Sequence, residues 1–243
     1  MRRGRWLTHV LLVLACFVVM VPVLFAFIKA TQHNTAVMSP SMVPGKELLN
    51  NIEAAWTKAR LGMFIRNSLF VAFVVTLGKT LTALMAGMAL VYFRFRGKSI
   101  VFGLILLTLM MPTEVLIVPL FDLIAQRPPA SWVVFWEWLR NPAKVFLQPL
   151  PHGLGWSNTY LALTIPFLAS ATGVFLFRQH FLSVPRELAD AAKIDGAGPL
   201  RFLWRILVPM SVNTIGALAV IQFVYVWDQY LWPRVIIRRE EMQ

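Results

Sequence analysis

Five long apolar segments, separated by polar ones, give the chain its pattern. These segments are 7–28, 67–93, 99–124, 158–177 and 207–231. Each has about 20 residues or more, the length that an α-helix needs to cross the hydrocarbon core of a bilayer. Prolines within them are tolerated because neighbouring helices can satisfy the freed backbone groups. The pattern therefore predicts an all-α, polytopic integral membrane protein with five transmembrane helices.

The first segment has a second interpretation. A basic N-terminus followed by a short apolar stretch that ends near Cys16 is also typical of a cleaved signal sequence. The apolar run continues to Ile28, well beyond Cys16, and more membrane-length segments follow. This continuation favours a retained transmembrane helix.

Composition supports a membrane protein. Hydrophobic residues make up 58% of the 243 residues and charged residues only 14%, against about 25% charged in typical soluble domains. A soluble protein of this length would expose more polar surface, so a cytosolic enzyme is not expected. The net charge of +12 is typical of proteins that meet nucleic acid or an anionic membrane, and the hydropathy favours the membrane. The single cysteine, Cys16, excludes an intramolecular disulfide.

The distribution of Lys and Arg predicts the orientation. If the N-terminus is inside, the inner segments 1–6, 94–98 and 178–205 hold 11 basic residues in 39 positions. The outer segments 29–66, 125–157 and 231–243 then also hold 11, but in 84 positions. Because cytoplasmic loops are enriched in Lys and Arg, the N-terminus is expected in the cytoplasm.

No catalytic or metal-binding pattern stands out. The triplets 78–80 and 97–99 read Gly-Lys-Thr and Gly-Lys-Ser, like the end of a phosphate-binding loop. Such a loop also requires a glycine five residues before the second one, and Phe73 and Tyr92 stand there instead. The four histidines show no metal-ligand spacing. We therefore expect neither nucleotide nor metal to bind to this chain.

The inner segment 178–206 is the most informative loop. Pro185 is well placed at a helix start and Ser183 at its N-cap, and Asp195-Gly196 predicts a turn that ends the helix. The helix has a narrow apolar side with small residues: Leu188, Ala191, Ala192 and Ile194. This side suits docking into a groove of a partner, and an ordinary solvated connection is the alternative.

The loop also carries a motif. It resembles the pattern E-A-A-x3-G-x9-I-x-L-P of the inner-membrane permease subunits of binding-protein-dependent ABC importers, at Asp190-Ala191-Ala192, Gly196, Ile206 and Pro209. Every spacing matches, and only Asp for Glu and Val for Leu depart from it. The longer run PRELADAAKIDGA at 185–197 is similar to the carbohydrate-type branch of this family.

The resemblance implies a type I ABC importer permease fold with six transmembrane helices, of which this chain would hold five and lack the last. It implies an N-terminal helix and outer loop at 1–66 and a core permease domain at 67–243. The implied partners are a second permease subunit, a cytoplasmic ABC ATPase dimer, an external solute-binding protein and membrane lipid, without nucleic acid. ATP and Mg²⁺ would be bound by the ATPase, so this chain would hold no cofactor and would not be an enzyme.

The resemblance assigns ATPase coupling to residues of the 187–209 loop. These are Glu187, Asp190, Ala191, Ala192, Asp195, Gly196, Ile206 and Pro209. It also places the protein in a bacterial inner membrane. A permease that alternates between two conformations can be driven by an ATPase only through contacts that differ between those conformations.

Four charged residues lie inside the apolar segments, Asp122 among them, and the other three are candidates for a role in transport. Lys79, Glu114 and Asp228 are expensive to hold in a membrane and usually face a cavity or a partner. One interpretation places them along the solute path, with Lys79 attracting an anionic substrate. The alternative puts Glu114 and Asp228 near water at the outer ends of their helices, and pairs Lys79 with a carboxylate of another subunit.

The overall likeness is strongest to permeases of glycerol 3-phosphate importers, which implies glycerol 3-phosphate or a glycerophosphodiester as the solute. A neutral sugar or oligosaccharide is the alternative within the same branch. A secondary transporter or a membrane assembly protein is the alternative of a different class. The tryptophan-rich segment 125–157 exceeds the short outer link of the family. It is expected to form an interfacial helix, with a contact to the solute-binding protein as the alternative.

Overall fold

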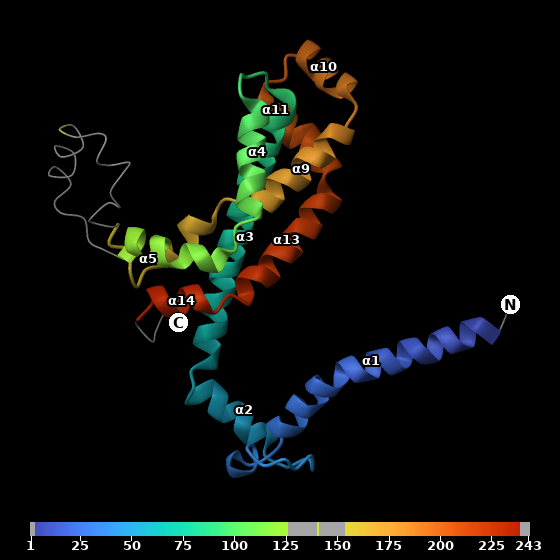
Figure 1. Ribbon diagram of the computed structural model, residues 1–243, viewed down its shortest axis with the longest axis vertical. Helices are drawn as coiled ribbons and strands as arrows, with labels where there is room; N and C mark the ends of the chain where they lie inside the picture. Colours follow the sequence, from blue (N-terminus) through green and yellow to red (C-terminus); the bar gives the residue numbers. More distant parts are fainter. Residues whose placement is uncertain (1–2, 126–139, 141–153, 239–243) are drawn as a thin grey trace. The chain divides into compact units, whose positions relative to one another are not determined.

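The computed structural model describes residues 3–125, 140 and 154–238 (Figure 1). The chain divides into two units, 1–63 and 64–243. The described part is helical and contains no strands, as the hydropathy pattern predicts. The predicted interfacial helix in 125–157 falls almost wholly outside the described residues.

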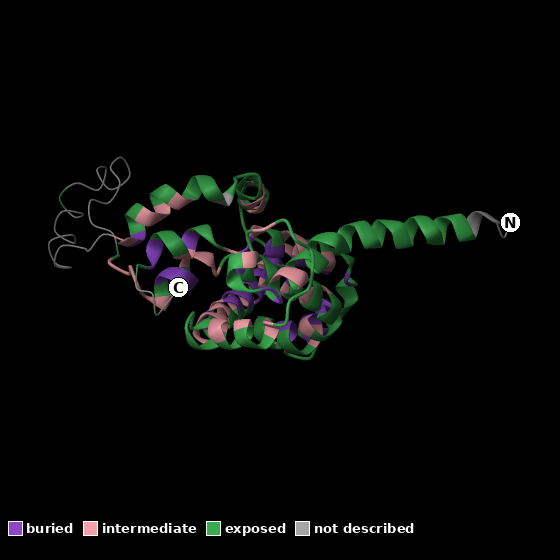
Figure 2. Ribbon diagram, turned by 90° about the horizontal axis from the view of Figure 1, so that it is seen from below, coloured by how far each residue is buried: buried purple, intermediate pink, exposed green. Residues whose placement is uncertain are grey.

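The first unit contains one membrane-length helix and a folded loop. Helix α1 (Arg3–Ala30) has no charged residue between Leu7 and Ile28, and its most hydropathic window is exposed (Figure 2). A helix that is hydrophobic all round is typical of a membrane span. A short 3₁₀ turn, η1 (Asn34–Ala36), and α2 (Leu48–Thr57) follow.

Lys29, in the last turn of α1, organises the loop that follows. Its ammonium donates to the carbonyls of Ser39 at 2.5 Å and Ser41 at 2.9 Å, and to the side chain of Gln32 at 3.1 Å. The Gln32 amide in turn donates to Ser41 and Val43. One lysine at a helix C-terminus, where positive charge is favourable, thus ties the loop to the helix.

The second unit begins within the long helix α3 (Leu61–Tyr92). The remaining helices of this unit are α4 (Lys98–Leu109), η2 (Thr113–Leu116), α5 (Ile117–Ala125), α8 (Tyr160–Thr164), η3 (Ile165–Phe167), α9 (Ala171–Ser183), α10 (Arg186–Ile194), α11 (Pro199–Phe202), η4 (Leu203–Leu207), α12 (Val208–Met210), α13 (Val212–Trp227) and α14 (Leu231–Ile236).

The main core of this unit joins α3, α9 and α13 through small residues. A Cβ on Gly87 of α3 would lie 2.8 Å from the Cβ of Phe177 and 3.2 Å from the backbone nitrogen of Arg178 in α9. A Cβ on Gly173 of α9 would lie 2.7 Å from the Cβ of Ala83. Small residues that let backbones approach closely are typical of helix packing in membranes.

A second, smaller core lies where α14 packs against α5 and α8. The indole of Trp232, which is almost completely buried, donates to the carbonyl of Ala162 at 3.0 Å. The backbone of Leu154 and Trp156 bonds to the last turn of α5. These contacts bring the chain back to α5 after the segment that the structure does not describe.

Two of the five predicted spans are bent. Three helices, Trp6–Ala30, Leu61–Tyr92 and Tyr160–Ser183, are long and apolar enough to cross a membrane, and up to five if each bent pair forms one span. The segment 99–124 bends by 94° between α4 and η2, at Pro112. With 12 residues, α4 is about 18 Å long, less than the hydrocarbon core.

The segment 207–231 bends by 82° at Ser211. Pro209 cannot donate to the carbonyl four residues earlier, and a π-helical stretch, η4, precedes it. The buried hydroxyl of Ser211 donates to the carbonyl of Leu207 at 2.6 Å. Proline, a π-bulge and a back-bonding serine are recognised causes of kinks, and all three meet here.

Candidate functional site

Helix α10 is amphipathic and lies at the same end of the second unit as the turn from α3 to α4 (Figure 1). Pro185 stands at the start of the helix, as the sequence predicts, and occupies the N-cap position. Ser183 does not cap it, because its hydroxyl donates back to the carbonyl of His180 at 2.7 Å. The predicted N-cap was therefore wrong: Ser183 is the last residue of α9.

Gly196 ends α10 in the conformation that the turn requires. Its φ of +70° lies in the left-handed region, which a glycine adopts without steric cost. Its N–H donates to the carbonyl of Lys193 at 3.1 Å, and the N–H of Ala197 donates to the carbonyl of Ala192 at 2.8 Å. This pair of bonds is a Schellman motif, which fixes the direction of the chain after the helix.

The two faces of α10 differ from the sequence prediction. Ala189 and Ala192 are buried in the main core, with Ala192 only 5% exposed. Ala191 and Ile194 are exposed. The prediction that Ala191 and Ala192 share a docking surface was therefore wrong, because Ala192 is already covered by its own chain.

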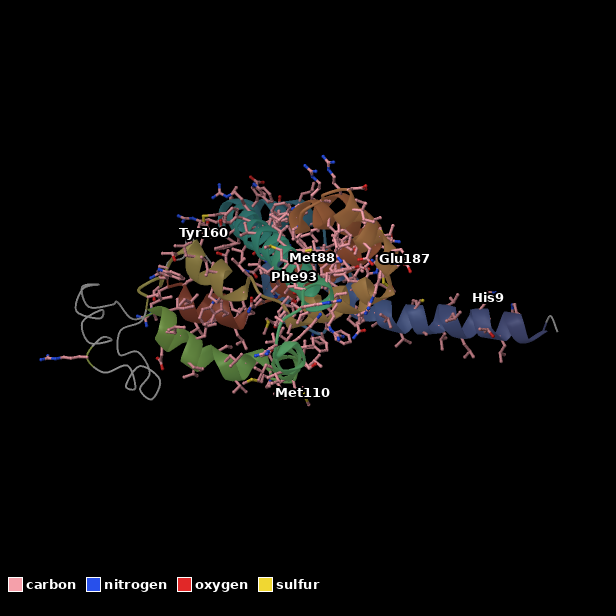
Figure 3. All side chains as sticks on the ribbon, turned by 90° about the horizontal axis from the view of Figure 1, so that it is seen from above. His9, Met88, Phe93, Met110, Tyr160 and Glu187 are labelled. Atoms are coloured by element: carbon pink, nitrogen blue, oxygen red, sulfur yellow. The ribbon has the colours of Figure 1, made fainter. Side chains whose placement is uncertain are left out.

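The exposed surface of α10 carries apolar, acidic and basic residues, the basic ones being Arg186 and Lys193. It includes Glu187 (Figure 3), Asp190, Ala191, Ile194 and Asp195, the C-cap. We call these five residues the outer face of α10. A chain with a net charge of +12 thus presents three carboxylates on one short helix.

Asp190 is paired with Lys193, a basic residue of the same helix. Its carboxylate accepts a hydrogen bond from Lys193 at 2.8 Å. This bond, with the charge of Lys193, lowers the pKa of Asp190 below its usual range. The stabilisation is therefore present at neutral pH and is lost as the pH falls through the lowered pKa. Because both side chains are exposed, the pair contributes little to stability.

The second half of the motif, Ile206 and Pro209, lies in the helices that follow α10. Ile206 packs against the core cluster that contains Ala189 and Ala192. Pro209 lies in α12, two residues before the 82° bend. The structure thus brings residues 187–196 together in one helix and its turn. Ile206 packs beneath that helix, and Pro209 lies next to the bend that follows.

Lys79 is the one charged side chain among the described residues that is buried, with 7% exposed. Its ammonium donates to the side-chain oxygen of Gln222 in α13 at 2.9 Å and lies 5.1 Å from the ring centre of Tyr225. The Gln222 amide donates to the hydroxyl of Ser170 at 3.1 Å, and this hydroxyl caps α9 by accepting from the N–H of Gly173. One polar chain therefore links α3, α13 and α9.

Glu114 and Asp228 lie elsewhere. Glu114 is exposed in η2, and Asp228 is exposed as the C-cap of α13. Within the described ranges, no hydrogen bond or ion pair joins either of them to Lys79. The structure does not gather the three charged residues into one cluster.

Sequence reasoning missed Gln222, Ser170 and Tyr225. Gln222 is separated from Lys79 by 143 positions, so no local pattern connects them. A signal was present, since Gln222 is an amide in the middle of the apolar segment 207–231, with apolar residues on both sides. Polar side chains in such segments are rarely without function.

Comparisons with known proteins agree with this architecture. Residues 78–240 match the family described as the binding-protein-dependent transport system inner membrane component. The chain is 38% identical over 236 residues to the sn-glycerol-3-phosphate transport system permease protein UgpE of Yersinia enterocolitica, covering 94% of this chain and 74% of that protein. It is also 38% identical over 245 residues to the UgpE protein of Salmonella typhi, covering 97% and 78%.

A solved structure has the same fold. It is the crystal structure of a bacterial ABC transporter involved in the import of the acidic polysaccharide alginate, with a TM-score of 0.73 and 19% identity. It covers 100% of this chain and 78% of that chain. The predicted all-α permease fold is confirmed. The chain belongs to the family of inner membrane components of binding-protein-dependent transport systems, and is a permease subunit of an ABC importer.

Proposed function

We propose that this permease forms part of the path for glycerol 3-phosphate or a glycerophosphodiester. The curated relatives named above transport glycerol 3-phosphate by their names. The observation that carries the proposal in this chain is the buried ammonium of Lys79. An organophosphate solute supplies the negative charge that this site lacks.

The surroundings of Lys79 favour an anion. An ammonium has three N–H donors. Among the described residues, the acceptor for the Lys79 ammonium is the neutral amide oxygen of Gln222. No carboxylate of the described residues lies within 4.0 Å of it. The nearby ring of Tyr225 adds a cation–π contact but no compensating charge. A buried charge with a neutral partner is expensive, so a passing phosphate would be attracted to this position.

Uptake by cells that carry Lys79→Met tests this role. We expect glycerol 3-phosphate uptake to fall at least about tenfold, since one charge-assisted hydrogen bond contributes roughly 1.5–3 kcal/mol. Lys79→Arg should retain part of it because it keeps the charge. Lys46→Met, at an exposed position, is the matched control. Equal amounts of membrane-inserted protein must be present in each strain. Undiminished uptake with Lys79→Met would overturn the proposed role.

We further propose that the outer face of α10 docks onto a cytoplasmic ABC ATPase, which binds ATP and Mg²⁺. The support is the match to the family pattern at 190–209 together with an exposed, acidic and apolar helix whose opposite side is fixed in the core. A rigidly seated helix can pass a movement of the ATPase to the membrane bundle. A second permease subunit and an external solute-binding protein complete the proposed importer.

The proposed orientation places the N-terminus and α10 in the cytoplasm of a bacterial cell. The density of basic residues supports it. Replacing Cys16 by serine and Glu187 by cysteine leaves one thiol on the outer face of α10. A membrane-impermeant maleimide should label it in inverted vesicles but not in intact cells. Labelling in intact cells would reverse the proposed orientation.

A further inference from the structure

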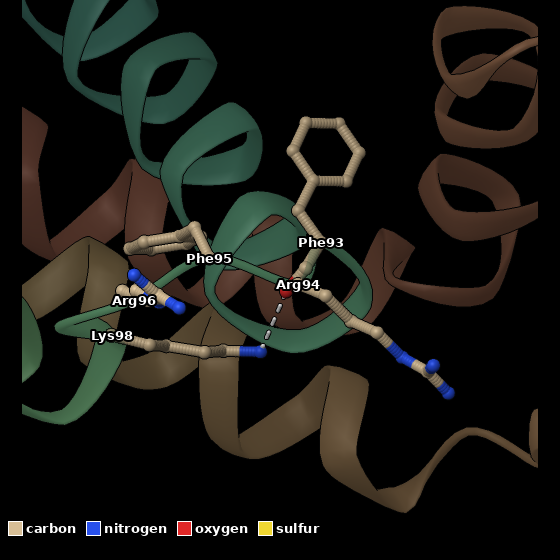
Figure 4. A pocket seen from close by; sticks show the side chains of 5 residues that line it. All are labelled: Phe93, Arg94, Phe95, Arg96 and Lys98. Atoms are coloured by element: carbon tan, nitrogen blue, oxygen red, sulfur yellow. Dashed lines mark hydrogen bonds between the residues drawn. The ribbon is translucent and has the colours of Figure 1, made fainter.

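A basic and aromatic pocket lies at the turn that joins α3 to α4. The turn reads Phe-Arg-Phe-Arg-Gly over 93–97. It borders a shallow, open pocket of about 520 Å³. The residues that line it are Phe93, Arg94, Phe95, Arg96 and Lys98 (Figure 4). Neither the coupling role of α10 nor the proposed solute path uses this pocket.

The turn is held in shape by its own residues. Gly97 has a φ of +80°, which allows the chain to reverse between the two helices. Lys98 folds back to the end of α3, where it donates to the carbonyl of Val91 at 3.0 Å and to that of Phe93 at 3.1 Å (Figure 4). Arg94 and Arg96 are exposed, and no hydrogen bond among the described residues uses their side chains. Two guanidinium groups are therefore available on a fixed frame.

Further positive charges approach from other helices. The guanidinium of Arg178 in α9 lies 4.0 Å from the ring centre of Phe102 in α4, and the charges of Arg178 and of Arg186 in α10 act on Lys98. We call the following residues the basic cluster: Arg94, Arg96, Lys98, Arg178 and Arg186. In the described ranges, the one ion pair joins Asp190 to Lys193. Asp190 acts on Arg94 and Arg186 only from a greater distance. The basic cluster therefore has no carboxylate within 4.0 Å in the described part of the chain.

An apolar strip begins directly at the pocket. Ile100, Leu104 and Leu107 of α4 are all exposed, at 70%, 58% and 59%. Their spacing of four and three residues places them on one side of the helix, and they extend for about 10 Å along it. The opposite side of α4 packs against α9, where Phe102 stacks on Phe175. Cations at one end of an exposed apolar strip match an amphipathic ligand.

We infer that this pocket binds the phosphate of an anionic phospholipid, whose acyl chains lie along the exposed strip of α4. Arg94 and Arg96 contact the phosphate, and Lys98 holds the turn beneath it. Phe93 and Phe95 occupy the boundary between headgroups and chains, where aromatic side chains are enriched. Free phosphate would use the cations but not the strip, and an acidic protein surface would leave the strip exposed. A lipid uses both.

Native mass spectrometry of the purified full chain tests the inference. The chain is mixed with equal amounts of phosphatidylglycerol and phosphatidylcholine in mild detergent. The lipids that stay bound are identified by mass and their amounts are compared. Each basic residue near an anionic membrane contributes roughly fivefold in affinity, so Arg94→Gln with Arg96→Gln should weaken phosphatidylglycerol binding about 25-fold. The double change to lysine at both positions should retain most of the binding, which excludes a mere folding defect.

The matched control is Arg201→Gln with Arg205→Gln. These two residues are also exposed, and the change removes the same charge outside the pocket, so binding should stay within about a factor of two. Equal retention of both lipids by the unaltered chain would overturn the inference. So would an equal loss in both glutamine variants, or displacement of the lipid by inorganic phosphate alone. Loss of ATPase binding with unchanged lipid retention would identify a protein contact instead.

Discussion

Substitutions at the neighbouring residues Ala191 and Ala192 can distinguish an effect on docking from an effect on folding of α10. Ala191 is exposed, and Ala192 is 5% exposed and packed in the main core. Replacement of either by leucine adds the same three carbons to the same helix, and leucine is nearly as good a helix former as alanine. The two variants therefore differ only in which side of α10 receives the added volume.

The expected energies follow from this burial. Leucine at 192 must displace neighbours in a packed core, which typically costs about 1–3 kcal/mol. Leucine at 191 enters solvent and should change the stability of the free permease by no more than about 0.5 kcal/mol. At the proposed ATPase contact, however, leucine at 191 blocks close approach. The 191 variant should fold normally and fail to dock.

Two measurements distinguish these effects. Hydrogen exchange of α10 should accelerate in Ala192→Leu and remain unchanged in Ala191→Leu, because exchange reports local opening. Co-purification of the ATPase from solubilised membranes should be lost in Ala191→Leu. If Ala191→Leu retained the ATPase as the unaltered chain does, the reasoning that assigns docking to the outer face of α10 would be refuted.

Three further changes test the packing. Gly87→Ala should destabilise the second unit by about 1–3 kcal/mol because the added carbon meets the backbone of α9. Gly78→Ala should destabilise it much less, because there the added carbon meets only a leucine side chain. Thermal unfolding of the two variants measures the difference. Lys29→Met should expose 34–43 to proteolysis, and unchanged cleavage would refute its role as a tie. Gln222→Leu should lower the unfolding temperature by breaking two buried hydrogen bonds, and an unaltered temperature would contradict this network.

The helical content and the turn after α10 could be predicted from sequence because both depend on local patterns. A predominantly apolar segment of 27 residues, such as 67–93, is a membrane helix in almost any context. Gly196 follows a helical segment at the position where a left-handed residue commonly ends it, and the structure confirms it with a φ of +70°.

The bends could not be predicted because an apolar segment looks the same whether it is straight or kinked. The segments 99–124 and 207–231 have the hydropathy of single spans, yet they bend by 94° and 82°. Pro112 and Pro209 indicate where a bend is possible. Its occurrence and size depend on how each half packs, as α4 does against α9.

The faces of α10 and the partners of Lys79 depend on tertiary contacts. The nine-residue helix has five apolar residues, and their positions alone do not specify which of them face the core. The spacing of Ala189 and Ala192 was a usable signal, since residues three apart share a face. For Lys79, the partner Gln222 comes from a distant helix, and only the fold brings the two together.

ATP-driven uptake by the reconstituted importer tests whether this permease serves an ATP-dependent path for glycerol 3-phosphate. The permease is placed in proteoliposomes with its second permease subunit, the ATPase and the solute-binding protein. Labelled glycerol 3-phosphate or a neutral disaccharide is then supplied. We predict that glycerol 3-phosphate accumulates only when ATP is present on the side of α10, and that the disaccharide does not accumulate. Accumulation without ATP, or of the disaccharide in preference to the phosphate, would contradict the account.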